Sequence, residues 1–93
     1  MEQNTTKKHR DFVSEPIGDK HVSELSGIGK VLGERMEKGG FKKASTVLGY
    51  YLVVREDHEE FQKWMKEKWG ANSKQSTDCY NCLKDWTATH ISA

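Results

Sequence analysis

Apolar side chains recur at helical spacing through the C-terminal half of the chain, and this periodicity constrains the fold more than any other feature. Two runs repeat apolar residues at positions i, i+3 and i+4, which places them on one face of a helix. The residues that carry the spacing are Phe61, Trp64, Met65, Trp69, Cys79, Cys82, Leu83 and Trp86. Asp57 and Ser76 stand where the N-caps of two such helices are expected. The sequence therefore predicts two amphipathic helices, separated by a polar loop over residues 71–76.

A third apolar stripe lies within residues 43–54. Its members are Val47, Leu48, Tyr51 and Leu52. The residues around Tyr51 also have the composition of a strand, but no partner strand is evident, so we predict a buried helix end. A short N-terminal helix is expected over Thr6–Val13, because the residue before Pro16 avoids the α region. We therefore predict one all-α domain over residues 1–93, a compact bundle of five or six short helices.

Length and charge exclude several classes of protein. The chain has 93 residues, and none of its apolar runs approaches the roughly 20 residues that span a bilayer. The polar N-terminus lacks the apolar region of a signal peptide, and two cysteines cannot form a disulfide framework. We therefore expect an intracellular protein with reduced thiols. Because the formal net charge is only +1, any attraction to nucleic acid must come from local placement of charge.

The sequence Gly27-Ile28-Gly29 joins two expected short helices, over Asp19–Leu25 and Lys30–Lys38. Two glycines around one apolar residue permit a tight turn, because glycine adopts backbone conformations that other residues avoid. With Ile28 in the core, the glycines let a ligand approach the backbone amides that open the second helix. Those amides and the helix dipole favour a phosphate oxygen.

Positive charge is present on both sides of this turn. Lys30 and Arg35 follow it, Lys7–Arg10 form a basic N-terminal patch, and Lys74 lies in the later polar loop. The whole is a helix-hairpin-helix pattern over about residues 20–38, which predicts binding to duplex DNA through phosphates and without base reading. Alternatively, the turn is an ordinary tight connection between helices, and the charged segments are a solvated terminus and a helix cap.

The spacing Cys79-x-x-Cys82 suggests a zinc or redox pair. A structural zinc site needs four ligands, however, and the four histidines of the chain are scattered. Within a helical stripe, both cysteines are more simply small core residues, so we expect no metal and no cofactor. No nucleophile and base stand together, and the chain is too short to add a base-flipping pocket to the hairpin. We therefore expect a protein that is not an enzyme.

Longer stretches carry a family resemblance. They are Lys8-His-Arg-Asp-Phe-Val, Glu15-Pro-Ile-Gly, Leu25-Ser-Gly-Ile-Gly, Gly40-Phe-Lys-Lys-Ala, Val47-Leu-Gly-Tyr-Tyr-Leu-Val-Val, Phe61-Gln-Lys-Trp-Met-Lys, Gly70-Ala-Asn-Ser-Lys-Gln-Ser and Asp78-Cys-Tyr-Asn-Cys-Leu-Lys-Asp-Trp. Together they resemble the barrier-to-autointegration factor family, which comprises chromatin and nuclear-envelope proteins of animal cells. The resemblance covers nearly everything from Lys8 to Trp86, in order and without gaps.

The resemblance implies a symmetric homodimer in which each subunit offers its hairpin to double-stranded DNA. Such a dimer bridges two duplexes, or two sites on one. With the remaining hairpin positions included, the implied DNA-binding residues are Lys8, Gly27, Ile28, Gly29, Lys30, Val31, Arg35, Asn72, Ser73, Lys74 and Gln75. Arg35 keeps the positive charge where the family often has a lysine.

The resemblance implies a second binding surface as well. LEM-domain proteins of the inner nuclear membrane bind members of the family in a groove across the dimer, and lamins and histones are further candidate partners. The groove residues implied here are Val53, Arg55, Phe61 and Trp64. The implied locations are the nucleus, at chromatin and the nuclear envelope, and also the cytoplasm.

N-terminal hydroxyl groups are phosphorylated in the family, and Thr5 and Thr6 hold that place here. Phosphorylation weakens DNA binding in the family. The physical reason is that a phosphate of about −1.5 to −2 charges beside Lys7 and Lys8 repels the DNA backbone.

The chain departs from the family pattern at several places. Thr77 stands where the family often has a basic residue, and residues 87–93 differ from the shorter family C-terminus. The rival hypothesis is an adaptor that keeps the fold and the partner groove but binds DNA weakly. Such an adaptor would have lost the hairpin glycines or the basic residues near them. Because Gly27, Gly29 and Lys8 are present, the sequence favours DNA binding.

Overall fold

Five α-helices and one 3₁₀ turn make up the regular structure of residues 6–91, the part of the chain that the computed structural model describes. In chain order they are α1 (Lys7–Ser14), the 3₁₀ turn η1 (Val22–Glu24), α2 (Lys30–Lys38), α3 (Ala44–Val53), α4 (His58–Trp69) and α5 (Ser73–His90). Within these residues there is no strand, and a single isolated bridge pairs His21 with Lys43. The all-α prediction is confirmed, although α5 has 18 residues and is not short.

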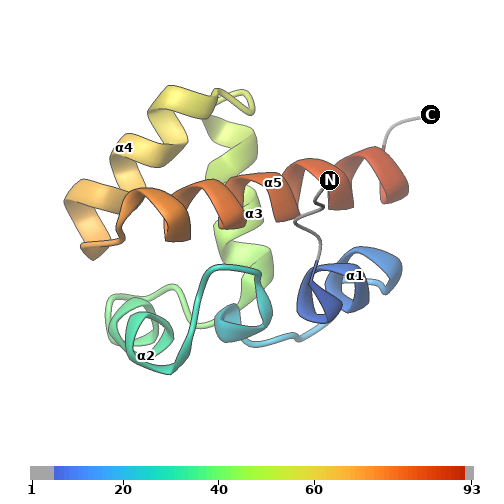
Figure 1. Cartoon of the computed structure of the whole chain (residues 1–93), viewed down its shortest axis with the longest axis horizontal. Helices are drawn as coiled ribbons and strands as arrows, with labels where there is room; N and C mark the ends of the chain where they lie inside the picture. The colour runs from blue at the N-terminus through green and yellow to red at the C-terminus, as the bar shows by residue number, and fades with distance from the viewer. Residues whose placement is uncertain (1–5, 92–93) are drawn as a thin grey trace.

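Helix α5 runs along the length of the molecule, with α4 on one side and α1 and α2 on the other (Figure 1). The core lies between these helices and draws side chains from every element. Its completely buried members include Val22, Ile28, Met36, Tyr51, Phe61, Met65, Cys79 and Leu83. No helix within residues 6–91 has both the length and the apolar character needed to cross a bilayer.

Local capping explains where α1 and α4 begin and end. The hydroxyl of Thr6 accepts the His9 amide at 3.1 Å and starts α1, which ends at Ser14, ahead of Pro16 as predicted. The Asp57 carboxylate accepts the Glu60 amide at 2.8 Å and starts α4, so the predicted cap is confirmed. Each cap satisfies an amide that has no partner within its own helix.

The start of α5 corrects two sequence predictions. Asn72, and not Ser76, is the N-cap, because its side chain accepts the Gln75 amide while the Gln75 side chain accepts the Asn72 amide, both at 2.8 Å. This reciprocal pair is a capping box. Ser76 is buried in the helix and donates its hydroxyl to the Asn72 carbonyl. Residues 73–76 are therefore the first turn of α5 and not a polar loop.

The first arm of the hairpin is also shorter than predicted. In place of a helix over residues 19–25, only η1 forms, and Leu25 already has extended backbone with φ −68° and ψ 139°. The cause is long-range pairing of the backbone. The amide of Val22 donates to Lys42 at 2.7 Å, and the amide of Ala44 donates to Lys20 at 3.0 Å. These bonds lie on either side of His21, whose backbone is extended at φ −67° and ψ 150°, so helical structure begins only at Val22.

Helix α3 confirms that the strand-like segment around Tyr51 is a helix end. Val47, Leu48 and Tyr51 are buried as predicted. Leu52 is the exception, because it is 43% exposed and does not belong to the buried stripe. It turns outward beside Val53, which is 75% exposed. The end of α3 therefore carries an apolar patch on the surface of the protomer.

Gly27 is the point of closest approach between the hairpin and α5. Its φ of +87° lies in the left-handed region. A Cβ atom at this position would lie 2.5 Å from the Gln75 carbonyl oxygen and 2.9 Å from the Asp78 Cβ. Both the backbone conformation and the contact with α5 therefore require a residue without a side chain. Gly29 differs, because nothing lies within 4 Å of its corresponding Cβ position.

Replacing Gly27 with alanine is expected to destabilise the fold by about 2–4 kcal/mol, through strain at positive φ and overpacking against α5. Urea unfolding followed by circular dichroism measures this change. The matched control is Gly29→Ala, which we expect to stay within about 1 kcal/mol of the wild type. Equal stability of the two variants would contradict the close packing of Gly27 on α5.

Candidate nucleic-acid interface

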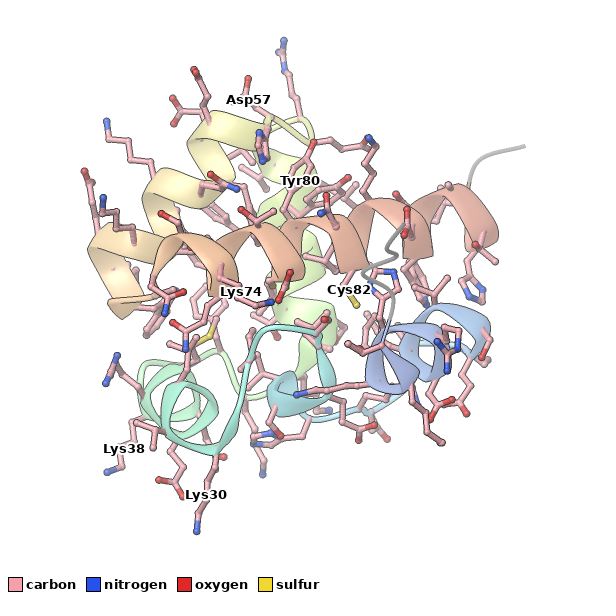
Figure 2. All side chains as sticks on the ribbon, viewed as in Figure 1. Lys30, Lys38, Asp57, Lys74, Tyr80 and Cys82 are labelled. Atoms are coloured by element: carbon pink, nitrogen blue, oxygen red, sulfur yellow. The ribbon has the colours of Figure 1, made fainter. Side chains whose placement is uncertain are left out.

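The N-terminus of α2 is open to solvent and has no side-chain cap. Its N-cap is Gly29, with φ −94° and ψ −163°, and no side chain accepts the first amides of the helix. Gly29, Lys30 and Val31 are exposed, and Figure 2 shows Lys30 projecting away from the body of the molecule. Unpaired amides at the positive end of a helix dipole bind anions well. This end of α2 therefore fits a phosphate oxygen.

Lys8 brings a positive charge from α1 to the same turn. Its ammonium group donates to the Ile28 carbonyl at 2.7 Å, and partial burial lowers the pKa of Lys8 below its usual value. The Ile28 side chain is completely buried. The Ile28 side chain therefore anchors the turn in the core, as predicted, and a contact of Ile28 with DNA, which stays a prediction, would involve its backbone.

The start of α5 lies against the hairpin, since Gly27 packs on Gln75 and Asp78. Of the predicted binding residues here, Ser73 and Lys74 are exposed. The Lys74 ammonium lies 2.8 Å from the Asp78 carboxylate, and Figure 2 shows it beside the hairpin.

Asn72 and Gln75 have a structural task at this end of α5. The side-chain oxygen of each residue accepts the backbone amide of the other in the capping box. Their amide NH₂ groups stay available as donors. The fold thus places the Asn72–Gln75 segment next to the hairpin, although Gly27 and Asn72 are 45 residues apart in the sequence.

Arg35 lies on α2 and points toward the end of α4. Its Nη1 atom donates to the Trp69 carbonyl at 2.6 Å. That carbonyl is among the last of α4, where helical partners run out and a cation interacts favourably with the helix dipole. Of the predicted DNA-binding residues, Arg35 is therefore the one that links α2 directly to the turn before α5.

His21 and Glu37 form a link between the two arms of the hairpin that the sequence did not reveal. The His21 Nε2 atom lies 2.7 Å from the Glu37 carboxylate, and its Nδ1 atom accepts the Ser23 amide at 3.1 Å. The hydrogen bond from His21 lowers the pKa of Glu37. Their separation of 16 residues follows no helical spacing. This link fixes η1 against α2, on either side of the turn at residues 27–29.

The residues implied for the partner groove divide into surface and core. Val53 is 75% exposed, and Arg55 is exposed at φ +60°. Trp64 is half-buried and stacks on Tyr50 with ring centroids 4.0 Å apart. Phe61 is completely buried in the protomer, so its role in partner binding, which stays a prediction, would be indirect. It packs beneath Trp64 and supports the surface from inside.

Thr6 is the described member of the implied phosphorylation pair. It is exposed, and its hydroxyl caps α1, only one residue before the basic patch that contains Lys8. Thr5 lies outside the residues that the structure describes.

Comparison with known proteins decides the family. A family model described as barrier to autointegration factor matches residues 3–90. The chain belongs to the barrier-to-autointegration factor family. A barrier-to-autointegration factor of Drosophila melanogaster is 58% identical over 82 residues, which cover 88% of this chain and 91% of that protein.

Vertebrate relatives give the same result. The barrier-to-autointegration factor of Danio rerio is 55% identical over 83 residues, covering 89% of this chain and 92% of the relative. The Homo sapiens protein is 54% identical over 82 residues, covering 88% and 92%. The all-helical fold described above is therefore that of a barrier-to-autointegration factor.

The divergent end of this family member continues α5 and packs on α1. The His90 Nε2 atom lies 2.7 Å from the Val13 carbonyl, and its ring stacks on Trp86 at 4.5 Å. Trp86 in turn donates its indole N–H to the Glu15 carbonyl at 3.0 Å. Both carbonyls lie at the C-terminal end of α1, where helical partners are missing. The last turns of α5 therefore hold the helix that carries Lys8.

Cys79 and Cys82 are both buried and free. Burial raises the pKa of Cys79 well above its usual value and that of Cys82 to about 11. Within residues 6–91, no cluster of three or more His, Cys, Asp or Glu side chains is placed to hold a metal ion. Both cysteines pack in the core, as their helical spacing predicts.

We predict that neither thiol reacts with an aromatic disulfide reagent at pH 8 in the folded protein, because both are buried and protonated. The measurement is the absorbance of the released thiolate, and protein unfolded in urea provides the control in which both thiols react. Rapid reaction of either cysteine in the native state would show that it is accessible and not a core residue.

Proposed function

We propose that the protein binds double-stranded DNA without sequence preference, and that its homodimer cross-bridges DNA without catalysing a reaction. The observation that carries this proposal is the uncapped N-terminus of α2, with the Lys8 ammonium held beside it on the Ile28 carbonyl. The neighbouring start of α5 adds Ser73 and Lys74. All of these groups are hydrogen-bond donors suited to phosphate oxygens. None of the elements that carry them presents a helix face or ribbon to a groove of the duplex, as the reading of bases requires.

Membership of the family supports the wider setting of this activity. We propose that two protomers associate so that each offers one hairpin to DNA, which gives a dimer the means to bridge two segments. The proposed role is chromatin organisation and nuclear-envelope assembly, with the protein in the nucleus, at chromatin and the envelope, and also in the cytoplasm. Lamins and histones are proposed as further partners.

A surface separate from the hairpin supports binding of LEM-domain proteins. Val53 leaves an apolar side chain 75% exposed, and Arg55 and Trp64 lie on the adjoining turn and helix. An exposed apolar patch of this kind favours a protein partner. The same patch keeps the adaptor hypothesis as a second candidate function, in which partner binding persists and DNA binding is weak.

Phosphorylation of Thr6 is proposed to regulate DNA binding. Its hydroxyl already caps α1, a position where a phosphate suits the helix dipole. The added negative charge would nevertheless lie close to Lys8 and compete with DNA for it. The modification is therefore expected to weaken DNA binding while α1 stays folded.

The substitution Gly29→Asp is expected to abolish DNA binding and to leave the fold slightly more stable. An aspartate N-cap accepts the α2 amides itself, which stabilises the helix by about 0.3 kcal/mol relative to glycine. Its negative charge then occupies the place of the phosphate. Titration of short unrelated duplexes at several salt concentrations measures the binding, beside urea unfolding of the same variant.

The control is Gly29→Ala, which adds a Cβ atom in open space and leaves the amides uncapped. It should lose much less affinity than Gly29→Asp, because it adds no negative charge and caps no amide. If Gly29→Asp binds normally while folded, the α2 N-terminus is not the phosphate site. Salt-independent binding by the wild type, or a strong preference for one duplex over a scrambled one, would contradict recognition of the backbone.

Val53→Lys is expected to separate the two proposed surfaces. It places a charge in the exposed apolar patch, so binding to a purified LEM domain should fall at least tenfold, or about 1.4 kcal/mol, in a calorimetric titration. Binding of one short duplex by the same variant should not fall. Loss of both activities together would show that the two surfaces are not independent in the assembled protein.

A further inference from the structure

We propose that Arg35 is a positioning residue, which holds the turn between α4 and α5 against α2 and so fixes the spacing of the two helix N-termini that face DNA phosphates. This inference rests on the proposed DNA binding and assigns Arg35 a different task from the direct phosphate contact expected from the sequence. It concerns two elements that meet only in the folded protein, namely the hairpin and the start of α5.

Two contacts tie α2 to Trp69, the last residue of α4. The Arg35 Nη1 atom donates to the Trp69 carbonyl at 2.6 Å. One turn later, a Cβ on Gly39 would lie 2.5 Å from the Trp69 ring, so the ring packs directly on the end of α2. Trp69 itself is only 4% exposed. Helix α2 therefore holds both the backbone and the side chain of this residue.

The chain leads from this held residue directly into the second phosphate-facing segment. Gly70 ends α4 in the left-handed region at φ +74°, Ala71 is buried, and Asn72 is the N-cap of α5. Only two residues separate Trp69 from that cap. Because this connection is short, a displacement of the Trp69 carbonyl also displaces the start of α5.

The other fixed point between these elements lies at the hairpin, where Gly27 packs on the Gln75 carbonyl. Gly27 precedes α2 and Arg35 lies in its second turn, so α5 is held at two places along the hairpin and α2. Helix α5 also packs on α1 and α4, so its overall direction does not depend on Arg35. Arg35 instead holds the turn that leads into α5, and thereby sets the spacing between the α2 and α5 N-termini.

The geometry of Gly70 provides a second way to break this contact. A Cβ at position 70 would lie 3.0 Å from the Arg35 Nη1 atom. The side chain of Arg35 is flexible, so Gly70→Ala is expected to push the guanidinium away from the Trp69 carbonyl. This variant keeps every positive charge of the protein. It therefore disturbs the positioning contact without removing a candidate phosphate ligand, and it also strains the end of α4, because Gly70 lies at φ +74°.

The test measures DNA affinity against salt concentration for Arg35→Gln, Gly70→Ala, the double variant and Lys74→Gln. Circular dichroism first identifies a temperature at which all four are folded. Lys74→Gln is the control for a direct phosphate contact. Its negative slope of log affinity against log salt should become shallower by about 0.9. Arg35→Gln should lose affinity about tenfold at every salt concentration while its slope stays at the wild-type value.

Gly70→Ala should show the same loss with the same slope. The double variant should be no weaker than either single variant, because both break one contact and their effects are not additive. Should Arg35→Gln fail to fold, the salt dependence of Gly70→Ala still decides the question, because displacing a direct phosphate ligand makes the slope shallower, whereas displacing a positioning contact leaves it unchanged.

Three results would overturn the proposal. The first is a slope for Arg35→Gln that becomes as shallow as that of Lys74→Gln. The second is wild-type affinity in Arg35→Gln or in Gly70→Ala, and the third is additive losses when these two substitutions are combined. Each of these leaves the proposed function intact, because the wild type still binds DNA. Absence of salt-sensitive binding by the folded wild type would instead overturn the proposed function and this inference with it.

Discussion

The rest of the structure depends on the close approach of Gly27 to α5. The hairpin touches the helix through backbone atoms, with the Gln75 carbonyl and Asp78 where a side chain would otherwise lie. Because Ile28 is then driven into the core, the next residue, Gly29, is left on the surface as the open cap of α2. One steric requirement therefore produces both the packing of the hairpin and its exposed amides.

The second requirement is that α1 stays in place, because it carries Lys8. Two side chains from the end of α5 bind its last carbonyls, namely His90 on Val13 and Trp86 on Glu15. A third contact joins His9 to Asp85 at 2.9 Å. The Lys8 ammonium closes the arrangement on the Ile28 carbonyl. Thus α5 supports the proposed binding surface at both of its ends, at the hairpin and at α1.

The features of this structure that the sequence predicted correctly are those that depend on interactions between residues close together in the chain. Helix α2 and the Asp57 cap follow from neighbouring residues and were predicted correctly. The first hairpin arm was wrong because bonds to residues 42–44 decide its conformation. The cap at Ser76 was wrong because the capping box begins at Asn72. The links made by His21 and Arg35 join residues 16 and 34 positions apart, which no local pattern encodes.

The charges explain how a protein of net charge +1 presents a basic site. Lys74 is paired with Asp78, and Lys7 with Asp11, each within 2.8 Å. Exposed pairs of this kind contribute little stability, so a phosphate can displace the carboxylate at small cost. Lys8 and Arg35 are held instead by backbone carbonyls. A carbonyl fixes a cation in space without neutralising it, so Lys8 places its positive charge next to the open end of α2, while Arg35 is fixed at the end of α4.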